Sequence, residues 1–90
     1  MPFEMNITDV FRLSDGRTVF AGRIPPDIGL IGHCRCELRL GSKVRQVIDC
    51  EGEQIVKKID PNNDLRSVAT TDKVELTVQE AQSGEWRLVG

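Results

Sequence analysis

Residues 5–24 read MNITDVFRLSDGRTVFAGRI, and this stretch decides the fold class. Its first part alternates apolar with polar residues, which is typical of a half-buried strand. The apolar residues on one parity, which we expect to face a core, are Met5, Ile7, Phe11 and Leu13. Asp15-Gly16 then favours a hairpin turn because glycine tolerates positive φ. Residues 17–24 are rich in β-branched and aromatic types, so they predict the returning strand.

The rest of the chain repeats this pattern of short strands and turns. Residues 33–40 (HCRCELRL) alternate apolar and charged side chains, and Gly41-Ser42 predicts a type II′ turn into a strand at 44–50. Gly52 interrupts the apolar stretch 47–59, which suggests a bulge at a barrel corner, and residues 60–63 (DPNN) predict a turn. Further strands are expected at 65–70, 73–79 and 86–89, although 75–82 also contains helix-tolerant residues. Six or seven strands predict one domain, 1–90, with the architecture of a small barrel or sandwich.

The charge balance limits the kinds of partner. The net charge is −2, which argues against binding nucleic acid through general phosphate neutralisation. Residues 1–47 hold seven cations against five anions, and residues 48–90 hold five against nine, so the halves carry +2 and −4. No apolar run approaches the ~20 residues of a membrane helix, and no secretory signal is visible, so we expect a cytoplasmic protein without a membrane role.

Metal binding or nucleophilic catalysis would have to use four residues: His33, Cys34, Cys36 and Cys50. On a strand, Cys34 and Cys36 share one face whereas His33 faces the opposite way, so a zinc site or a Cys-His pair would need a kink. Buried, reduced thiols are the simpler interpretation. Asp49, Glu51 and Glu53 alternate on one expected face and predict a solvated acidic edge rather than an acid–base pair. We therefore expect no metal, no cofactor and no catalysis.

Several short motifs resemble a known family. They are Asp9-Val10-Phe11, Gly16, Thr18-Val19 and Gly22-Arg23 in the first hairpin, then Ile31-Gly32, Cys36-Glu37-Leu38, residues 72–76 (DKVEL) and residues 86–90 (WRLVG). Together they resemble the second, β-barrel domain of elongation factor Tu and related translational GTPases. The resemblance implies a closed Greek-key barrel of about six strands, in which Leu13 and Val19 match apolar positions of an aminoacyl pocket. The chain has no G-x-x-x-x-G-K-[ST] phosphate loop, which excludes nucleotide hydrolysis by that motif.

The expected function is that of a non-catalytic binding module of the translation-factor barrel type, with a protein or RNA partner. If the arginine-bearing faces of the two predicted hairpins adjoin, they would form a guanidinium patch suited to phosphate or to an acidic protein. The candidate binding residues are Leu13, Arg17, Val19, Arg23, Arg35 and Arg39. An alternative is an accessory protein that binds one specific protein or forms a homo-oligomer. A third interpretation, an enzyme, would require one of the three cysteines to be reactive.

Overall fold

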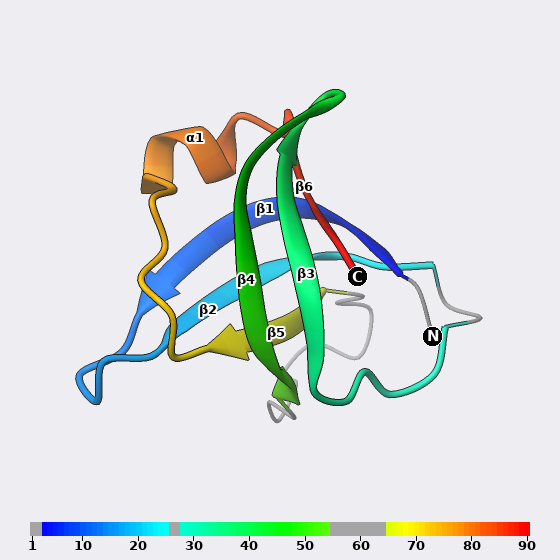
Figure 1. Cartoon of the computed structure of the whole chain (residues 1–90). Helices are drawn as coiled ribbons and strands as arrows, with labels where there is room; N and C mark the ends of the chain where they lie inside the picture. The colour runs from blue at the N-terminus through cyan, green and yellow to red at the C-terminus, as the bar shows by residue number, and fades with distance from the viewer. Residues whose placement is uncertain (1–2, 26–27, 55–64) are drawn as a thin grey trace.

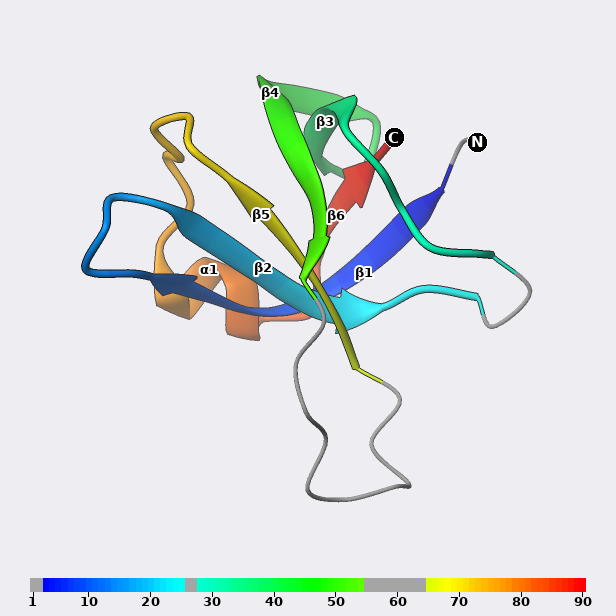
Figure 2. The ribbon, with the colours of Figure 1, turned by 90° about the horizontal axis from the view of Figure 1, so that it is seen from below.

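The computed structural model describes residues 3–25, 28–54 and 65–90. The elements in this part are β1 (Glu4–Arg12), β2 (Thr18–Arg23), β3 (Cys34–Leu40), β4 (Lys43–Gln54), β5 (Arg66–Thr70), α1 (Val78–Gln82) and β6 (Trp86–Val89). All strand pairs are antiparallel, and the strands close into a barrel in the order β1-β2-β5-β4-β3-β6 (Figures 1 and 2). Because β2 lies next to β5 while β3, β4 and β5 are successive neighbours, the order is that of a Greek key. The predicted all-β barrel is confirmed.

The first hairpin forms as predicted, but its inward face changes along β1. Gly16 has a φ of +92°, and the Leu13 amide donates to the Arg17 carbonyl over 2.8 Å. The β1–β2 register shifts between Ile7 and Asp9, and this irregularity reverses the alternation of side chains. Val10 consequently faces the core, whereas Phe11 is 49% exposed and Leu13 40% exposed. The expectation that Phe11 and Leu13 share the inward face of Ile7 is therefore wrong.

The second hairpin and the bend of β4 follow the glycine signals. Gly41 has a φ of +60° and Ser42 does not have positive φ, which matches the predicted type II′ turn. The register of β4 with β5 shifts between Cys50 and Gly52, where Gly52 has a φ of +128°. The predicted bulge is confirmed, and it lets β4 pair with β3 along its first part and with β5 along its last. Residues 55–59 of the predicted strand and the turn at 60–63 lie outside the described residues.

The connection between β5 and β6 is not the strand expected at 73–79. Val74 and Leu76 do point into the core, but the next residues begin helix α1. Thr77 and Glu80 form a capping box, in which the Glu80 amide donates to Thr77 Oγ1 and the Thr77 amide donates to Glu80 Oε1, both over 3.1 Å. Arg12 donates to the carbonyls of Val74 and Leu76 over 2.9 and 3.0 Å. The groups that a strand ladder would pair are thus satisfied by side chains, since six other strands already close the barrel.

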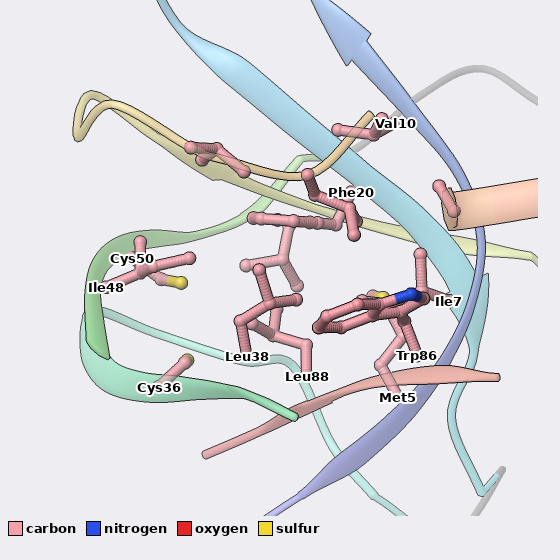
Figure 3. Packing of buried hydrophobic residues seen from close by; sticks show 14 of the residues in the cluster. Met5, Ile7, Val10, Phe20, Cys36, Leu38, Ile48, Cys50, Trp86 and Leu88 are labelled. Atoms are coloured by element: carbon pink, nitrogen blue, oxygen red, sulfur yellow. The ribbon is translucent and has the colours of Figure 1, made fainter. Parts of the chain in front are cut away.

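The core fills the space inside this closed sheet (Figure 3). The largest fully buried side chains come from all the strands and from the β5–β6 connection: Phe20, Met5, Ile7, Leu38, Ile48, Leu76, Leu88, Val10 and Val68. Trp86 closes the cluster at 4% exposure. In the described part of the chain, no helix has the length and apolar character needed to cross a membrane.

A mostly buried ion pair fixes the loop that leads into β3. Arg66 and Glu53 form a bidentate salt bridge. Nε of Arg66 lies 2.8 Å from Oε2 of Glu53, and Nη2 of Arg66 lies 2.6 Å from Oε1 of Glu53. The Arg66 guanidinium also donates to the carbonyls of Ile28 and Gly29, over 2.9 and 2.7 Å. A main-chain hydrogen bond also ties the loop to β4: the Glu53 amide donates to the Ile31 carbonyl over 2.8 Å. The side chains of Arg66 and Glu53 are only 15% and 12% exposed, so water screens this pair weakly.

The close approach of β1 and β2 predicts a severe effect at Gly22. A Cβ on this residue would collide with the carbonyl oxygen of Asn6 and would lie 2.7 Å from Met5 Cγ. We expect Gly22→Ala to lower the free energy of unfolding by roughly 2–3 kcal/mol in urea titration, as overpacking against main chain does. Gly29→Ala is the matched control because a Cβ there meets nothing within 4 Å. Equal stability of the two variants would contradict the described strand packing.

Removal of Arg66 should uncover the buried carboxylate of Glu53. We expect Arg66→Met to lower the free energy of unfolding by roughly 2–3 kcal/mol. The poorly hydrated carboxylate of Glu53 would lose its salt bridge, and the carbonyls of Ile28 and Gly29 would lose their hydrogen-bond donors. Arg87→Met breaks a pair with Glu4 whose side chains are 46% and 58% exposed. That variant should change the urea midpoint far less. If Arg87→Met lowered the free energy of unfolding as much as Arg66→Met, this stabilising role of the Arg66–Glu53 salt bridge would be refuted.

Candidate functional site

Three of the six candidate binding residues lie at the turn end of the β1–β2 hairpin. Leu13 and Arg17 face each other across the turn, and Val19 lies opposite Phe11 in the ladder. Arg17 is engaged by Asp15, with Nε to Oδ2 at 2.9 Å, and lies 3.8 Å from a carboxylate oxygen of Glu51. The Arg17 amide and guanidinium hold the pKa of the Asp15 carboxyl below its usual range. Since Val19 is only 9% exposed, this hairpin offers a small apolar spot rather than an open pocket.

The other three candidates lie away from this turn. Arg23 lies opposite Asn6 at the far end of β2 and takes part in an interaction there. Arg35 and Arg39 lie on β3, which stands with β4 in front of β1, β2 and β5 in Figure 1. The two sets of arginines therefore occupy different sides of the barrel and do not form one guanidinium patch.

The side chains of Arg35 and Arg39 share a shallow groove on the outer face of the sheet. We call it the β3 groove and define it by its lining residues: Arg35, Glu37, Arg39, Val47, Val89 and Gly90. Val47 and Val89 lie on either side of Glu37 in the β4-β3-β6 ladder. Val47 is 52% exposed, so the groove combines an apolar surface with alternating charges.

Sequence reasoning missed the valines of this groove. Most exposed positions of β4 are charged, and Val44 and Val47 are the apolar exceptions among those described. Val44, which lies opposite Arg39 in the ladder, adds exposed apolar surface on the same hairpin at 44% exposure. An apolar residue on the solvent parity of a strand was the available signal. Val89 had no such signal, because its place beside β3 depends on barrel closure.

The carboxylates near Arg35 interact with other side chains. Arg39 Nε donates to Glu37 Oε1 over 2.8 Å. His33 Nε2 lies 3.0 Å from Asp49 Oδ1 on the same outer face. The Arg35 guanidinium itself makes no hydrogen bond or ion pair with any described residue, although Asp49 lies directly opposite it in the ladder. Arg35 is thus an exposed cation whose neighbouring carboxylates are already engaged.

The single tryptophan does not provide a stacking surface for a base. The Arg45 guanidinium lies over the Trp86 ring at 4.2 Å and also pairs with Glu80 at 2.8 Å. The same Arg45 contact holds the pKa of the Glu80 carboxyl below its usual range. Trp86 is covered by these contacts and by the core, so single-strand binding by stacking would have no aromatic platform there.

The cysteines gather on the inner face at one end of β3 and β4. Cys34 Sγ lies 3.5 Å from Cys36 Sγ, and Cys34 is paired with Cys50 across the ladder. Burial is the main cause that raises the pKa of the Cys34 thiol, to about 11. A hydrogen bond with Cys50, together with burial, raises the pKa of Cys36 as well.

The ring of His33 lies on the outer face with Asp49, as its parity predicted, so it does not converge with the thiols. Within the described ranges, no three potential ligands are arranged to hold a metal ion. Of the expected acidic edge, Asp49 and Glu51 are exposed, whereas Glu53 turns beyond the Gly52 bulge to meet Arg66.

These thiols should react slowly in the folded protein. At pH 8 a thiol with a pKa of about 11 is ionised to about 0.1%, against about a quarter for an ordinary cysteine. Iodoacetamide should therefore label the native protein at least about 100-fold more slowly than free cysteine, with the rate rising as pH approaches 11. Mass spectrometry of native and urea-unfolded samples measures this. Rapid native labelling of one thiol would revive the enzyme interpretation.

Comparisons with known proteins found no matching family model, no matching curated protein and no matching solved structure. The likeness to the second domain of elongation factor Tu therefore stays a prediction from the sequence motifs, and the fold and the β3 groove carry the functional argument.

Proposed function

We propose that this protein is a non-catalytic binding module of the translation-factor barrel type, and that its partner is a protein that docks on the β3 groove. The observation that supports the proposal is the set of partners that the arginine side chains have. Arg12 binds main-chain carbonyls, and Arg17, Arg39, Arg45, Arg66 and Arg87 pair with carboxylates. Among the arginines of the described chain, Arg35 is the one whose guanidinium has no partner.

This use of charge favours protein over RNA. RNA affinity depends on several cations that contact successive phosphates and release counterions. Here a phosphate would have to compete with carboxylates that already hold the guanidinium groups. A protein interface has different needs, since its centre is apolar and its rim is polar. Val47 and Val89, bordered by Arg35 and the Glu37–Arg39 pair, supply that combination.

Two further observations support a binding role over catalysis. The thiols of Cys34 and Cys36 have raised pKa values, which opposes formation of a nucleophilic thiolate at neutral pH. His33, the single histidine, lies on the outer face beside Asp49 instead of beside a thiol. The motifs of the first hairpin favour a translation-related partner, and this part of the proposal rests on the sequence resemblance alone.

Self-association is the second candidate, favoured by the exposed valines of the β3–β4 hairpin. Light scattering during size-exclusion chromatography separates the two candidates. A dimer that Val47→Asp converts to monomer would favour self-association, and a monomer at all concentrations would exclude it.

Partner capture tests the proposed protein-binding function. Immobilised wild-type protein should retain a protein from a lysate of the source cells, and Val47→Asp should reduce that protein at least about tenfold, because a charge would be buried in the interface. Arg17→Glu is the matched control, since it alters a cation in the turn before β2, a strand that lies three places from β3 in either direction round the barrel. Labelled tRNA should show no saturable anisotropy change at 150 mM salt. Saturable binding of tRNA, with Val47→Asp capture unchanged, would overturn the proposal in favour of RNA.

A further inference from the structure

The loop that leads into β3 presents one leucine to solvent. Leu30 is 74% exposed, the highest value among the large apolar side chains of the described residues. Its neighbours turn inward, since Ile28 packs against the core and Ile31 is buried. In Figure 1 the loop joins the lower end of β3, whereas the β3–β4 turn lies at the upper end. A single exposed leucine is common on protein surfaces, but the loop around this one has two further properties.

The first property is that the main chain on both sides of Leu30 is held in place. Arg66 donates to the carbonyls of residues 28 and 29 over 2.9 and 2.7 Å. The Ile31 amide donates to the Glu53 carboxylate over 3.2 Å, and the Ile31 carbonyl accepts from the Glu53 amide over 2.8 Å. Leu30 is therefore presented by a loop that is already ordered, so a contact through it would cost little conformational entropy in the main chain.

The second property is a hollow of about 260 Å³ that the same loop surrounds, lined by residues 28–34. This segment reads IGLIGHC and contains no aspartate, glutamate, lysine or arginine. Its isoleucines and Leu30 supply apolar lining. Gly29 and Gly32 leave open space, because a Cβ on either would meet nothing within 4 Å. Such a hollow suits an apolar side chain, since a charged one would lose its hydration there.

A protruding leucine beside an apolar hollow is self-complementary. In a two-fold contact the same patch of each copy meets the other, so each copy both offers and receives the same groups. Leu30 of one copy can thus enter the hollow of the second copy while the reverse contact forms. Identical surfaces that carry full charges would bring like charges together, and residues 28–34 carry none of the four charged residue types. These features favour a second copy of this chain as the occupant.

We propose that two copies of this protein associate through residues 28–34, with Leu30 of each copy filling the hollow of the other. The proposal goes beyond the protein-binding function, because this segment and the β3 groove share no residue. The contact is small, since a stable interface uses about 20–30 residues a side. The dimer is therefore weak and reversible, with a dissociation constant on the order of 100 µM.

Sedimentation equilibrium of the purified protein tests the dimer. We expect mainly monomer at about 10 µM and mainly dimer at about 1 mM. Leu30→Asp should weaken association at least about tenfold, because a carboxylate would have to enter the apolar hollow. Val78→Asp is the matched control, since Val78 is 46% exposed and lies on α1, outside this segment. It should dimerise as the wild type does. An unchanged urea midpoint for Leu30→Asp would show that the fold is intact.

NMR of a mixture of isotope-labelled and unlabelled copies tests the place of the contact. Isotope-filtered NOEs should join the Leu30 methyl groups of one copy to the methyl groups of Ile28 and Ile31 in the other. Intermolecular NOEs confined to another surface would overturn the proposal, as would a monomer at about 1 mM. A dimer that Val47→Asp dissociates and Leu30→Asp leaves intact would also overturn it and would assign association to the β3–β4 hairpin.

Failure of this dimer and failure of the proposed function are distinguishable. Partner capture through the β3 groove should persist in Leu30→Asp and be lost in Val47→Asp, whatever the state of association. If Leu30→Asp dissociated the dimer but Val47→Asp left capture unchanged, the dimer would stand and the β3 groove proposal would fall.

Discussion

The bend of β4 at Gly52 is the constraint on which the rest of the structure depends. One strand must pair with β3 over its first part and with β5 over its last, and it can do so only if its register shifts between Cys50 and Gly52. The φ of +128° at Gly52 suits glycine, and a Cβ would lie 3.1 Å from the Ile31 carbonyl oxygen. The same bend turns Glu53 toward Arg66, which fixes the loop before β3. Closure of the barrel and placement of the β3 groove therefore depend on one residue.

Closure of the barrel also determines which partners the charged side chains have. A small barrel has little interior, so most ionic groups lie on its surface and pair with neighbours across strands or loops. Arg45 covers Trp86, and Arg12 satisfies the carbonyls of a connection that has no strand partner. A cationic sequence segment therefore does not give a cationic surface. Arg35 differs because both nearby carboxylates have other partners, and this local arrangement makes it the strongest candidate for recognition.

Much of the fold could be predicted because turns and strand alternation are local properties. Gly16, Gly41 and Gly52 marked two hairpin turns and a bulge, and all three are present. The predictions that failed concern residues whose conformation depends on contacts with neighbouring strands or on helix capping. Phe11 points outward because β1 shifts its register against β2, and residues 73–79 leave the sheet because Thr77 and Glu80 cap a helix. The candidate site could be predicted in part, since Arg35 and Arg39 were visible as outward residues of β3 but Val47 and Val89 were not selected.

The local patterns of the sequence predicted an all-β chain of six or seven strands and placed His33 apart from the cysteines. These properties follow from side-chain period and turn chemistry, which act over a few residues. Tertiary structure alone decided which arginines pair with carboxylates and which valines line the β3 groove. Each of these depends on residues far apart in the chain, such as Arg66 with Glu53 or Val89 with Glu37. Strand order and register bring them together, and local sequence signals do not encode either one.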